Sequence, residues 1–218
     1  LAWYLYQRKL LRQASLVHCA SHNEENNLKK LDPQIKTVTL PFGINKKDIK
    51  RNFSRKIKRR CVFLSRLHKK KGLDILIKAW IALKDKNWSL DIVGFGNKKN
   101  FMHLIKNTKN SKIRFLKPII NSSLKNKFFN NYDFLALPSL NENFGIVILE
   151  SLARGLAVLT TNETPWIGIQ NKNAGWVINY SIIELKLALH QIFNTKDREF
   201  YIKKKMPLKL QNNIQKKI

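Results

Sequence analysis

Residues 61–83 read CVFLSRLHKKKGLDILIKAWIAL, and this stretch decides the fold class. It opens with an apolar run, CVFLS, of the length and composition typical of a buried strand. From Gly72 onward, apolar residues recur at the spacing by which a helix turns one face inward. A basic loop lies between the two. A buried strand followed at once by an amphipathic helix is the repeating unit of a parallel sheet covered by helices.

The same alternation continues toward the carboxyl end of the chain. It predicts further strands over 88–93, 113–116, 134–137, 157–160 and 176–178, and helices near 101–105 and over 124–130, 145–154 and 182–193. Before Cys61, the pattern predicts a helix over 3–13 and strands over 16–19 and 37–40. We therefore expect the α/β class, with a Rossmann-like parallel sheet and helices on both of its faces.

The charge of the chain is strongly positive. Its 218 residues include 42 Lys and Arg against 14 Asp and Glu, a formal net charge of +28. Basic residues concentrate between positions 46 and 60, which we interpret as a connection, and again from Thr195 onward. Such an excess is typical of proteins that bind an anionic membrane surface. A solvated surface is the simpler explanation, and we expect no specific nucleic acid as partner because no known nucleic-acid module is present.

Other features of the composition exclude several classes of protein. With 44% hydrophobic residues, the chain can bury a core. No apolar run reaches the roughly 18 residues of a membrane span, and the start of the chain does not resemble a signal peptide. Cys19 and Cys61 are too few for a disulfide framework and lack metal-ligand spacing. We expect a cytoplasmic protein without a bound metal, and a position at the inner face of the membrane is the alternative.

The first candidate site is the basic loop after the strand at 61–65. Ligands of open α/β sheets bind beyond the carboxyl ends of the strands. Cationic side chains at that place can clamp an anionic ligand. Arg66 and Lys71 are the candidates, and a solvated basic loop is the alternative interpretation.

The second candidate site is PSLNENFGIVILE, residues 138–150. The strand ends at Pro138, a loop carries Glu142, and a helix begins near Gly145 with free backbone N–H groups that can bind phosphate. Glu150 is expected to face the same crevice as Glu142, where two carboxylates can accept hydrogen bonds from a hydroxyl-rich ligand. The alternatives are a helix cap for Glu142 and a surface charge for Glu150.

Taken together, these segments resemble a known family. FLSRLHKKKGLDILIKAW, LDIVGFGN, IRFLKPI, FFNNYDFLALPSLNENFGIVILESLARGLAVLTTNETPW and AGWVINY, in this order, resemble the donor-binding half of the retaining family 4 glycosyltransferases of GT-B fold, which belong to the glycosyl transferases group 1. Upstream, LLRQASLVHCASHNEENNL and VTLPFGI resemble the end of the first domain and its crossover. The resemblance covers roughly residues 9–193, and several segments in the right order are more specific than any one alone.

The resemblance implies roles for the candidate residues. Glu142 would contact the donor sugar, Glu150 the nucleotide ribose, and Arg66 and Lys71 the phosphates, so that Glu142, Arg66 and Lys71 are the catalytic candidates. Further donor-binding positions are implied on both sides of the phosphates: Asn143, Phe144, Gly145 and Ile146 at the helix start, and Leu116, Lys117 and Ile119, which would frame the nucleobase. No metal and no cofactor is implied, since the nucleotide-diphosphate sugar is a substrate.

The resemblance also implies how the chain is divided. Residues 1–45 would be the end of an amino-terminal, acceptor-side domain and its crossover, and 46–57 a basic linker. Residues 58–195 would be the nucleotide-sugar-binding GT-B domain, and 196–218 a basic carboxyl-terminal tail. The first residue is Leu rather than Met, so we expect the chain to begin inside a longer protein with an amino-terminal domain missing here.

The implied activity is transfer of a sugar, with retention of configuration, to a glycan or lipid-linked acceptor. The segment TTNETPW resembles members that build lipopolysaccharide or other surface polysaccharides. The sequence departs from the family at Ser65, where glycine is usual, and at Ala157, where proline is usual. Two alternatives stay open, a truncated and non-catalytic nucleotide-sugar-binding remnant and a basic membrane-associated adaptor on the same scaffold.

Overall fold

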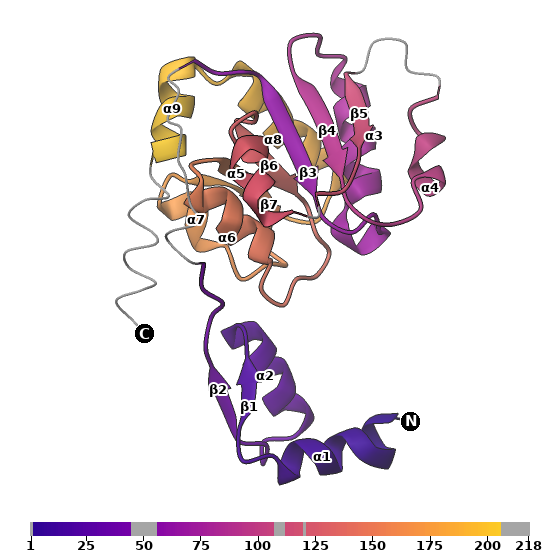
Figure 1. Ribbon diagram of the computed structural model, residues 1–218, viewed down its shortest axis with the longest axis vertical. Helices are drawn as coiled ribbons and strands as arrows, with labels where there is room; N and C mark the ends of the chain where they lie inside the picture. Colours follow the sequence, from indigo (N-terminus) through magenta and orange to yellow (C-terminus); the bar gives the residue numbers. More distant parts are fainter. Residues whose placement is uncertain (1, 45–55, 107–111, 120, 206–218) are drawn as a thin grey trace.

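The computed structural model describes residues 2–44, 56–106, 112–119 and 121–205. Within these residues lie a two-stranded sheet, in a small amino-terminal unit, and a six-stranded sheet in a larger unit (Figure 1). Every strand pair in both sheets is parallel. The predicted class, α/β with a Rossmann-like parallel sheet and helices on both faces, is confirmed.

The small unit contains one continuous helix, formed by η1 (Trp3–Gln7) and α1 (Arg8–Gln13), and one strand–helix–strand unit. The elements of the latter are β1 (Val17–Cys19), α2 (His22–Leu31) and β2 (Thr37–Thr39). Helix α2 was not among the predicted elements, because its sequence HNEENNLKKL has only two apolar residues and no apolar stripe. It begins at a side-chain cap, since the Ser21 Oγ accepts a hydrogen bond from the Glu24 backbone N–H at 3.2 Å.

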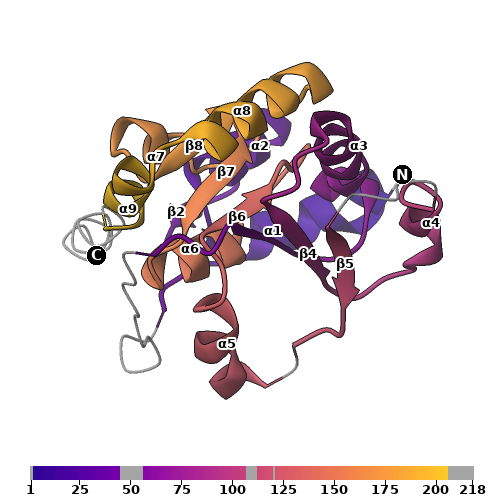
Figure 2. The same ribbon diagram turned by 90° about the horizontal axis from the view of Figure 1, so that it is seen from above.

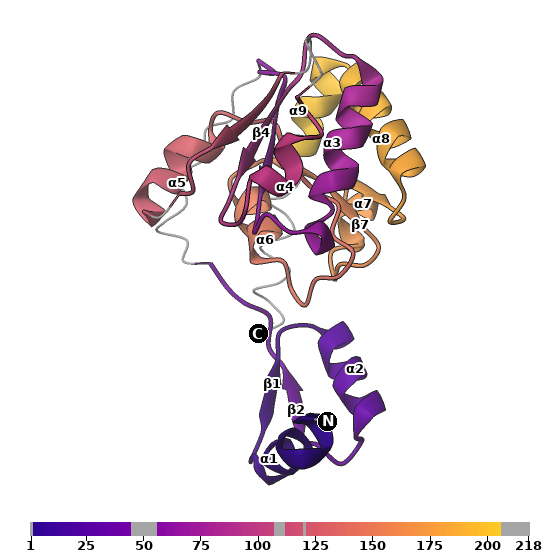
Figure 3. The ribbon, with the colours of Figure 1, turned by 90° about the vertical axis from the view of Figure 1, so that its right-hand side faces the viewer.

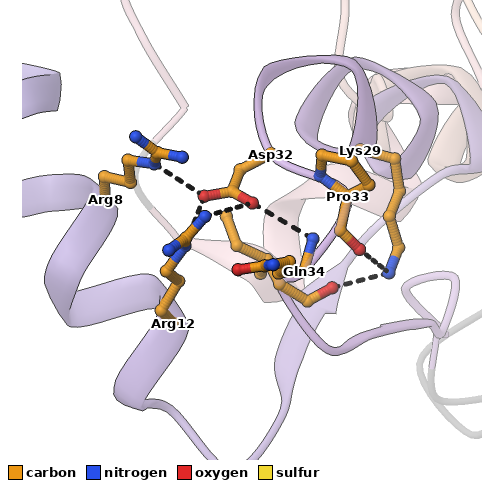
Figure 4. A network of polar contacts seen from close by, with 7 residues as sticks. Arg8, Arg12, Lys29, Asp32, Pro33 and Gln34 are labelled. Carbon is orange, nitrogen blue, oxygen red and sulfur yellow. Dashed lines mark hydrogen bonds and ion pairs between the residues drawn. The ribbon is translucent and has the colours of Figure 1, made fainter.

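A buried carboxylate joins helix α1 to the segment after α2 (Figure 4). Asp32, whose side chain is 1% exposed, accepts hydrogen bonds from Arg12 Nε at 2.6 Å and Arg8 Nε at 2.8 Å. It also accepts the backbone N–H of Gln34 at 3.1 Å. These bonds favour the charged form and lower the pKa of Asp32, with Arg12 as the largest cause.

The large sheet has the strand order β5-β4-β3-β6-β7-β8. Its strands are β3 (Arg60–Leu64), β4 (Ser89–Val93), β5 (Ile113–Leu116), β6 (Phe134–Leu137), β7 (Ala157–Thr161) and β8 (Gly175–Ile178). Strand β3 is central, and its Cys61 pairs with Leu90 on one side and Phe134 on the other. The chain adds strands outward from β3 and then from β6 in the opposite direction, so the order reverses between these two strands. Ligands of such sheets bind at this reversal.

Helices cover both faces of the large sheet. They are α3 (Leu73–Leu83), α4 (Lys99–Met102), α5 (Ser122–Phe129), α6 (Ile146–Ala153), α7 (Gly168–Asn171), α8 (Ile182–Asn194) and α9 (Asp197–Lys205), besides the short η3 (Lys69–Lys71). Helices α3 and α8 pack side by side on one face, and α5 and α6 lie on the other (Figure 2, Figure 3). None of the helices in the described ranges has the length and apolar character that a membrane span needs.

Helix α9 changes the interpretation of the carboxyl-terminal residues. Residues 197–205, which we predicted as part of a basic tail, form a helix whose Phe200 is fully buried against Trp88, Phe134 and Trp176. On the next turn, Lys204 Nζ lies 3.0 Å from the Asp133 carboxylate, and both side chains are buried. The rest of the predicted tail, 206–218, and most of the predicted linker, 46–55, lie outside the described residues. The predicted domain boundaries stay predictions.

Another buried carboxylate joins three strands of the large sheet. Asp91 on β4 is fully buried and accepts hydrogen bonds from Arg114 Nε at 2.7 Å, Arg60 Nη2 at 2.6 Å and the Tyr132 hydroxyl at 2.8 Å. Burial alone would raise the pKa of Asp91, but the three donors outweigh burial and lower it. The Tyr132 hydroxyl, buried and bonded to this carboxylate, has a raised pKa.

One glycine brings the two predicted site loops together. Gly72, between η3 and α3, adopts a left-handed conformation with φ of 69°. A Cβ atom at this position would lie 1.9 Å from the carbonyl oxygen of Pro138 at the end of β6. The backbone N–H of Leu140 donates to the carbonyl oxygen of Lys70 at 2.8 Å, which joins the loops a second time. The loop after β3 and the loop after β6 are therefore in direct backbone contact.

Candidate functional site

The centre of the site is an ion pair between the two loops. Lys71 Nζ lies 2.7 Å from Glu142 Oε1, and the two side chains are 14% and 12% exposed. The Ser139 hydroxyl donates to the same carboxylate oxygen at 3.3 Å. Glu142 therefore does not cap a helix but pairs with a cation that lies 71 positions earlier in the chain.

This pair lines a cavity of about 360 Å³, which we call the diphosphate cavity after the ligand that we propose for it below. Seven predicted site residues meet there: Arg66, Lys71, Glu142, Asn143, Phe144, Gly145 and Ile146. Arg66 is exposed and makes no ion pair with any described residue. The small unit contributes Phe42, which packs edge-on against Phe144 at 5.3 Å.

Helix α6 begins at the wall of the diphosphate cavity. Its first residue, Ile146, follows Gly145, which has a φ of 73° and provides no side-chain cap. The preceding Phe144 is held in place because its carbonyl oxygen accepts the indole N–H of Trp166. Uncapped backbone N–H groups at a helix start favour an anion, and two cations face the same cavity.

Glu150 lies elsewhere. It is not among the described residues that line the diphosphate cavity. Its carboxylate pairs with Lys125 Nζ of α5 at 2.6 Å, and the side chain is 17% exposed. Four residues correspond to about 6 Å along a helix, so Glu150 lies one turn deeper than Ile146, where α5 supplies a partner. Its role stays a prediction.

The three residues expected to frame the nucleobase follow β5. Leu116 and Ile119 are partly buried against the core, and Lys117 is exposed. The carbonyl oxygen of Leu116 accepts from Lys98 Nζ at 3.4 Å. Two strands separate β5 from β6, and these residues are not part of the described lining of the diphosphate cavity. Their role also stays a prediction.

A second, strongly polar cavity of about 290 Å³ lies between α2 and the loops after β6 and β7, and we call it the asparagine cavity. Glu142 and Asn143 line both cavities. The Asn143 side-chain amide donates to Glu24 Oε1 at 2.9 Å and so joins the small unit to the large one. The sequence did not predict this site, because α2 lacks the apolar stripe by which a helix is recognised. The pattern Ser21-x-x-Glu24, typical of a capped helix start, was the available signal.

Comparison with known proteins gives a family and a fold. The model of the family "Glycosyl transferases group 1" matches residues 44–216. An uncharacterised glycosyltransferase of Haemophilus influenzae is 28% identical over 120 residues, which cover 52% of this chain and 33% of the relative. The chain thus spans about a third of the length of this curated relative.

Two solved structures illustrate the similarity of fold. Sucrose-phosphate synthase from Thermosynechococcus elongatus superposes with a TM-score of 0.81 at 18% identity, over 96% of this chain and 56% of the other. Anabaena HepE, solved in complex with UDP and glucose, superposes with a TM-score of 0.79 at 16% identity, over 96% and 60%. At such identities the likeness concerns the fold, which agrees with the observed sheet. Since the family model covers more than half of its residues, the chain belongs to the glycosyl transferases group 1 family.

Proposed function

We propose that the chain binds a nucleotide-diphosphate sugar and serves its transfer, with retention of configuration, to a hydroxyl of a glycan or lipid-linked acceptor. One observation carries this proposal. The Lys71–Glu142 pair, exposed Arg66 and the uncapped start of α6 line one cavity at the strand reversal. Cations and helix N–H groups suit a diphosphate, and the carboxylate suits sugar hydroxyls. The UDP and glucose in HepE support the same ligand class.

In this proposal the protein acts mainly on the leaving group. When the bond between the anomeric carbon and the diphosphate oxygen breaks, negative charge grows on the diphosphate. Arg66, Lys71 and the first N–H groups of α6 stabilise that charge. The acceptor oxygen bonds to the anomeric carbon, and its proton passes to the departing diphosphate. Glu142 accepts a hydrogen bond from the donor sugar, and no metal or cofactor takes part.

The nucleoside would extend from the diphosphate cavity toward β5. In this arrangement Glu150 accepts hydrogen bonds from the ribose hydroxyls, which partly replace its ion pair with Lys125. The backbone of residues 116–119 frames the base. The ordered segments from FLSRLHKKKGLDILIKAW to AGWVINY support membership of family 4, and TTNETPW supports an acceptor of the lipopolysaccharide or surface-polysaccharide type.

A thermal-shift panel tests the proposed function. UDP, GDP, ADP and UDP-glucose are compared with the corresponding nucleosides and with inorganic pyrophosphate at equal ionic strength. A ligand that binds only the folded chain raises its melting temperature, so we expect one nucleoside diphosphate to exceed both its nucleoside and pyrophosphate. Equal shifts for all anions would instead support the basic adaptor, which the net charge of +28 favours. Such general anion binding would also collapse with salt.

A further inference from the structure

We propose that the asparagine cavity binds the hydroxyl-rich end of the acceptor, and that it selects a neutral or amine-bearing sugar against one that carries phosphate or carboxylate. The inference rests on the proposed function, since it names the acceptor class of the same reaction. It is carried by the chemistry of the lining, by the position of the cavity and by the sign of its charge.

The lining is rich in side-chain amides. It includes six asparagines: Asn23, Asn26, Asn27, Asn141, Asn143 and Asn162. An asparagine side chain offers both donors and an acceptor, and a sugar hydroxyl needs both kinds of partner. Among the described residues, neither Asn26 nor Asn141 has a side-chain hydrogen-bond partner. Such amides are available to a ligand.

The amides of α2 point the same way because of their spacing. Asn26 and Asn27 follow Asn23 by three and four positions, and Lys30 follows them by four and three, which places all four on one face of the helix. The facing wall consists of the loops at 141–143 and 162–163. With about 290 Å³, the cavity is at the lower end of the sizes known for small-molecule sites. It suits the end of a glycan rather than a whole macromolecule.

The asparagine cavity adjoins the place where the donor sugar would react. Glu142 and Asn143 form part of both cavities. An acceptor held by the amides therefore presents its hydroxyls beside Glu142, where we place the donor sugar. Asn143 is kept at this boundary by its bond to Glu24.

The charge of the lining is opposite to that of the chain. The lining has three carboxylates but only one ammonium group; the carboxylates are those of Glu24, Glu142 and Glu163, and the ammonium is that of Lys30. Lys71 offsets Glu142, but the described donors to Glu24 are the neutral N–H groups of Ala20 and Asn143. In a chain of net charge +28, this cavity repels anions and accepts neutral or cationic groups.

Ligand-observed NMR titration of the 218-residue chain with simple glycosides tests the inference. The probes are methyl glucoside, methyl glucosaminide, methyl glucuronide and glucose 6-phosphate, each with and without saturating UDP. We expect the first two to bind at least about 5-fold more tightly than the two anions. Equal or tighter binding of the anionic sugars overturns the inference.

Matched variants locate the binding. Asn26→Ala removes one amide from the α2 face, and we expect binding of methyl glucoside to weaken about 3- to 10-fold. Asn171→Ala, on exposed α7, is the control and should change nothing. Glu163→Lys should bring the neutral and anionic sugars within about 2-fold of each other, whereas Glu199→Lys on α9 makes the same change in charge far from the cavity. Equal effects within either pair overturn the inference.

The titrations with and without UDP distinguish failure of this inference from failure of the proposed function. UDP binding without neutral-glycoside binding overturns the acceptor site and leaves the donor site supported. Glycoside binding that depends on Asn26 but occurs without any nucleotide binding supports a sugar site and contradicts the proposed transfer. Loss of glycoside binding in Arg66→Ala but not in Asn26→Ala would place the sugar in the diphosphate cavity and overturn the inference.

Discussion

Lys71 and Glu142 are each other's partners across two loops, and a bound diphosphate would compete for the same ammonium. The pair is mostly shielded from water, with 14% and 12% of the side chains exposed. In the proposed donor site, Arg66, which makes no ion pair with described residues, would bind phosphate without breaking an existing pair. The two cations thus differ in what they give up on binding.

Replacing both Arg66 and Lys71 by alanine should reduce affinity for the nucleoside diphosphate about 10-fold or more, because each makes a charge-assisted bond to phosphate. Affinity for the bare nucleoside should change little. Isothermal titration calorimetry measures both. Lys69→Ala with Lys70→Ala removes the same charge from the same loop and is the control. If nucleoside and diphosphate affinities fall equally, the phosphate site lies elsewhere.

Tyr132→Phe should lower the free energy of unfolding at pH 7 by about 1.5–3 kcal/mol, because it removes a buried hydrogen bond to the charged Asp91. Since the pKa of Asp91 is lowered in the folded state, the stabilisation exists above the unfolded pKa of about 3.9 and is lost as the pH falls through the lower, folded value. The difference between wild type and variant should therefore shrink below about pH 4.

Urea unfolding at pH 7 and at pH 3 measures this difference. Tyr6→Phe serves as control because the Tyr6 side chain is 53% exposed. A difference between wild type and Tyr132→Phe that stays constant across this pH range would show that Asp91 is not the group responsible.

At the scale of elements, the contact between η3–α3 and the end of β6 builds the site. Gly72→Ala should destabilise the fold by several kcal/mol, because the new methyl group would meet the Pro138 carbonyl oxygen at 1.9 Å in a left-handed backbone conformation. Gly168→Ala is a matched control, since nothing lies within 4 Å of a Cβ at that position. Thermal unfolding measures the melting temperatures of both variants. A Gly72→Ala protein as stable as the wild type would contradict the close approach of the two loops.

Helix α9 belongs to the core rather than to a tail. Phe200→Ala should cost about 3–5 kcal/mol, the usual range for a buried phenylalanine. Ile202→Ala, two residues away with 42% of its side chain exposed, should cost far less. Guanidinium unfolding compares them, and equal midpoints for the two variants would mean that α9 does not pack as described.

The elements differ in how well their sequences predict them. The strands β3 and β6 and the helix α3 can be predicted from their apolar patterns, because burial in the core requires apolar residues at these positions. Helix α2 has no such stripe, and what holds it is tertiary. Its Glu25 accepts hydrogen bonds from Thr37 at 2.7 Å and Thr39 at 2.6 Å on β2. Likewise DREFYIKKK of α9 has the composition of a solvated segment. Its place in the core becomes evident only from the packing of Phe200.

The parts of the candidate site also differ in how far the sequence predicts them. Arg66, Lys71 and Glu142 could be brought together from the sequence, because the loops after neighbouring parallel strands meet at one edge of the sheet. The placement of Glu150 could not be predicted from the sequence, since it depends on an ion pair with Lys125 of α5. Local sequence does not specify which side chain of another helix lies opposite.

For the whole molecule, transfer requires donor and acceptor to be held against each other. The chain spans 33% of the length of its Haemophilus relative. We expect the 218-residue chain to bind a nucleoside diphosphate but to transfer sugar slowly by itself. A radiolabelled-donor assay measures this, with the Arg66→Ala and Lys71→Ala double variant as blank. Rapid acceptor-dependent transfer without an added protein would contradict the expectation.

The adjacency of β3 and β6 also determines when the site can form in the cell. The ribosome releases β3, α3, β4 and β5 before β6, and until β6 emerges one edge of β3 has no partner. An open edge of a buried, apolar strand invites pairing with other chains. The nascent chain therefore passes through a stage in which Lys71 is made, Glu142 is not, and the edge of β3 that should receive β6 is still open.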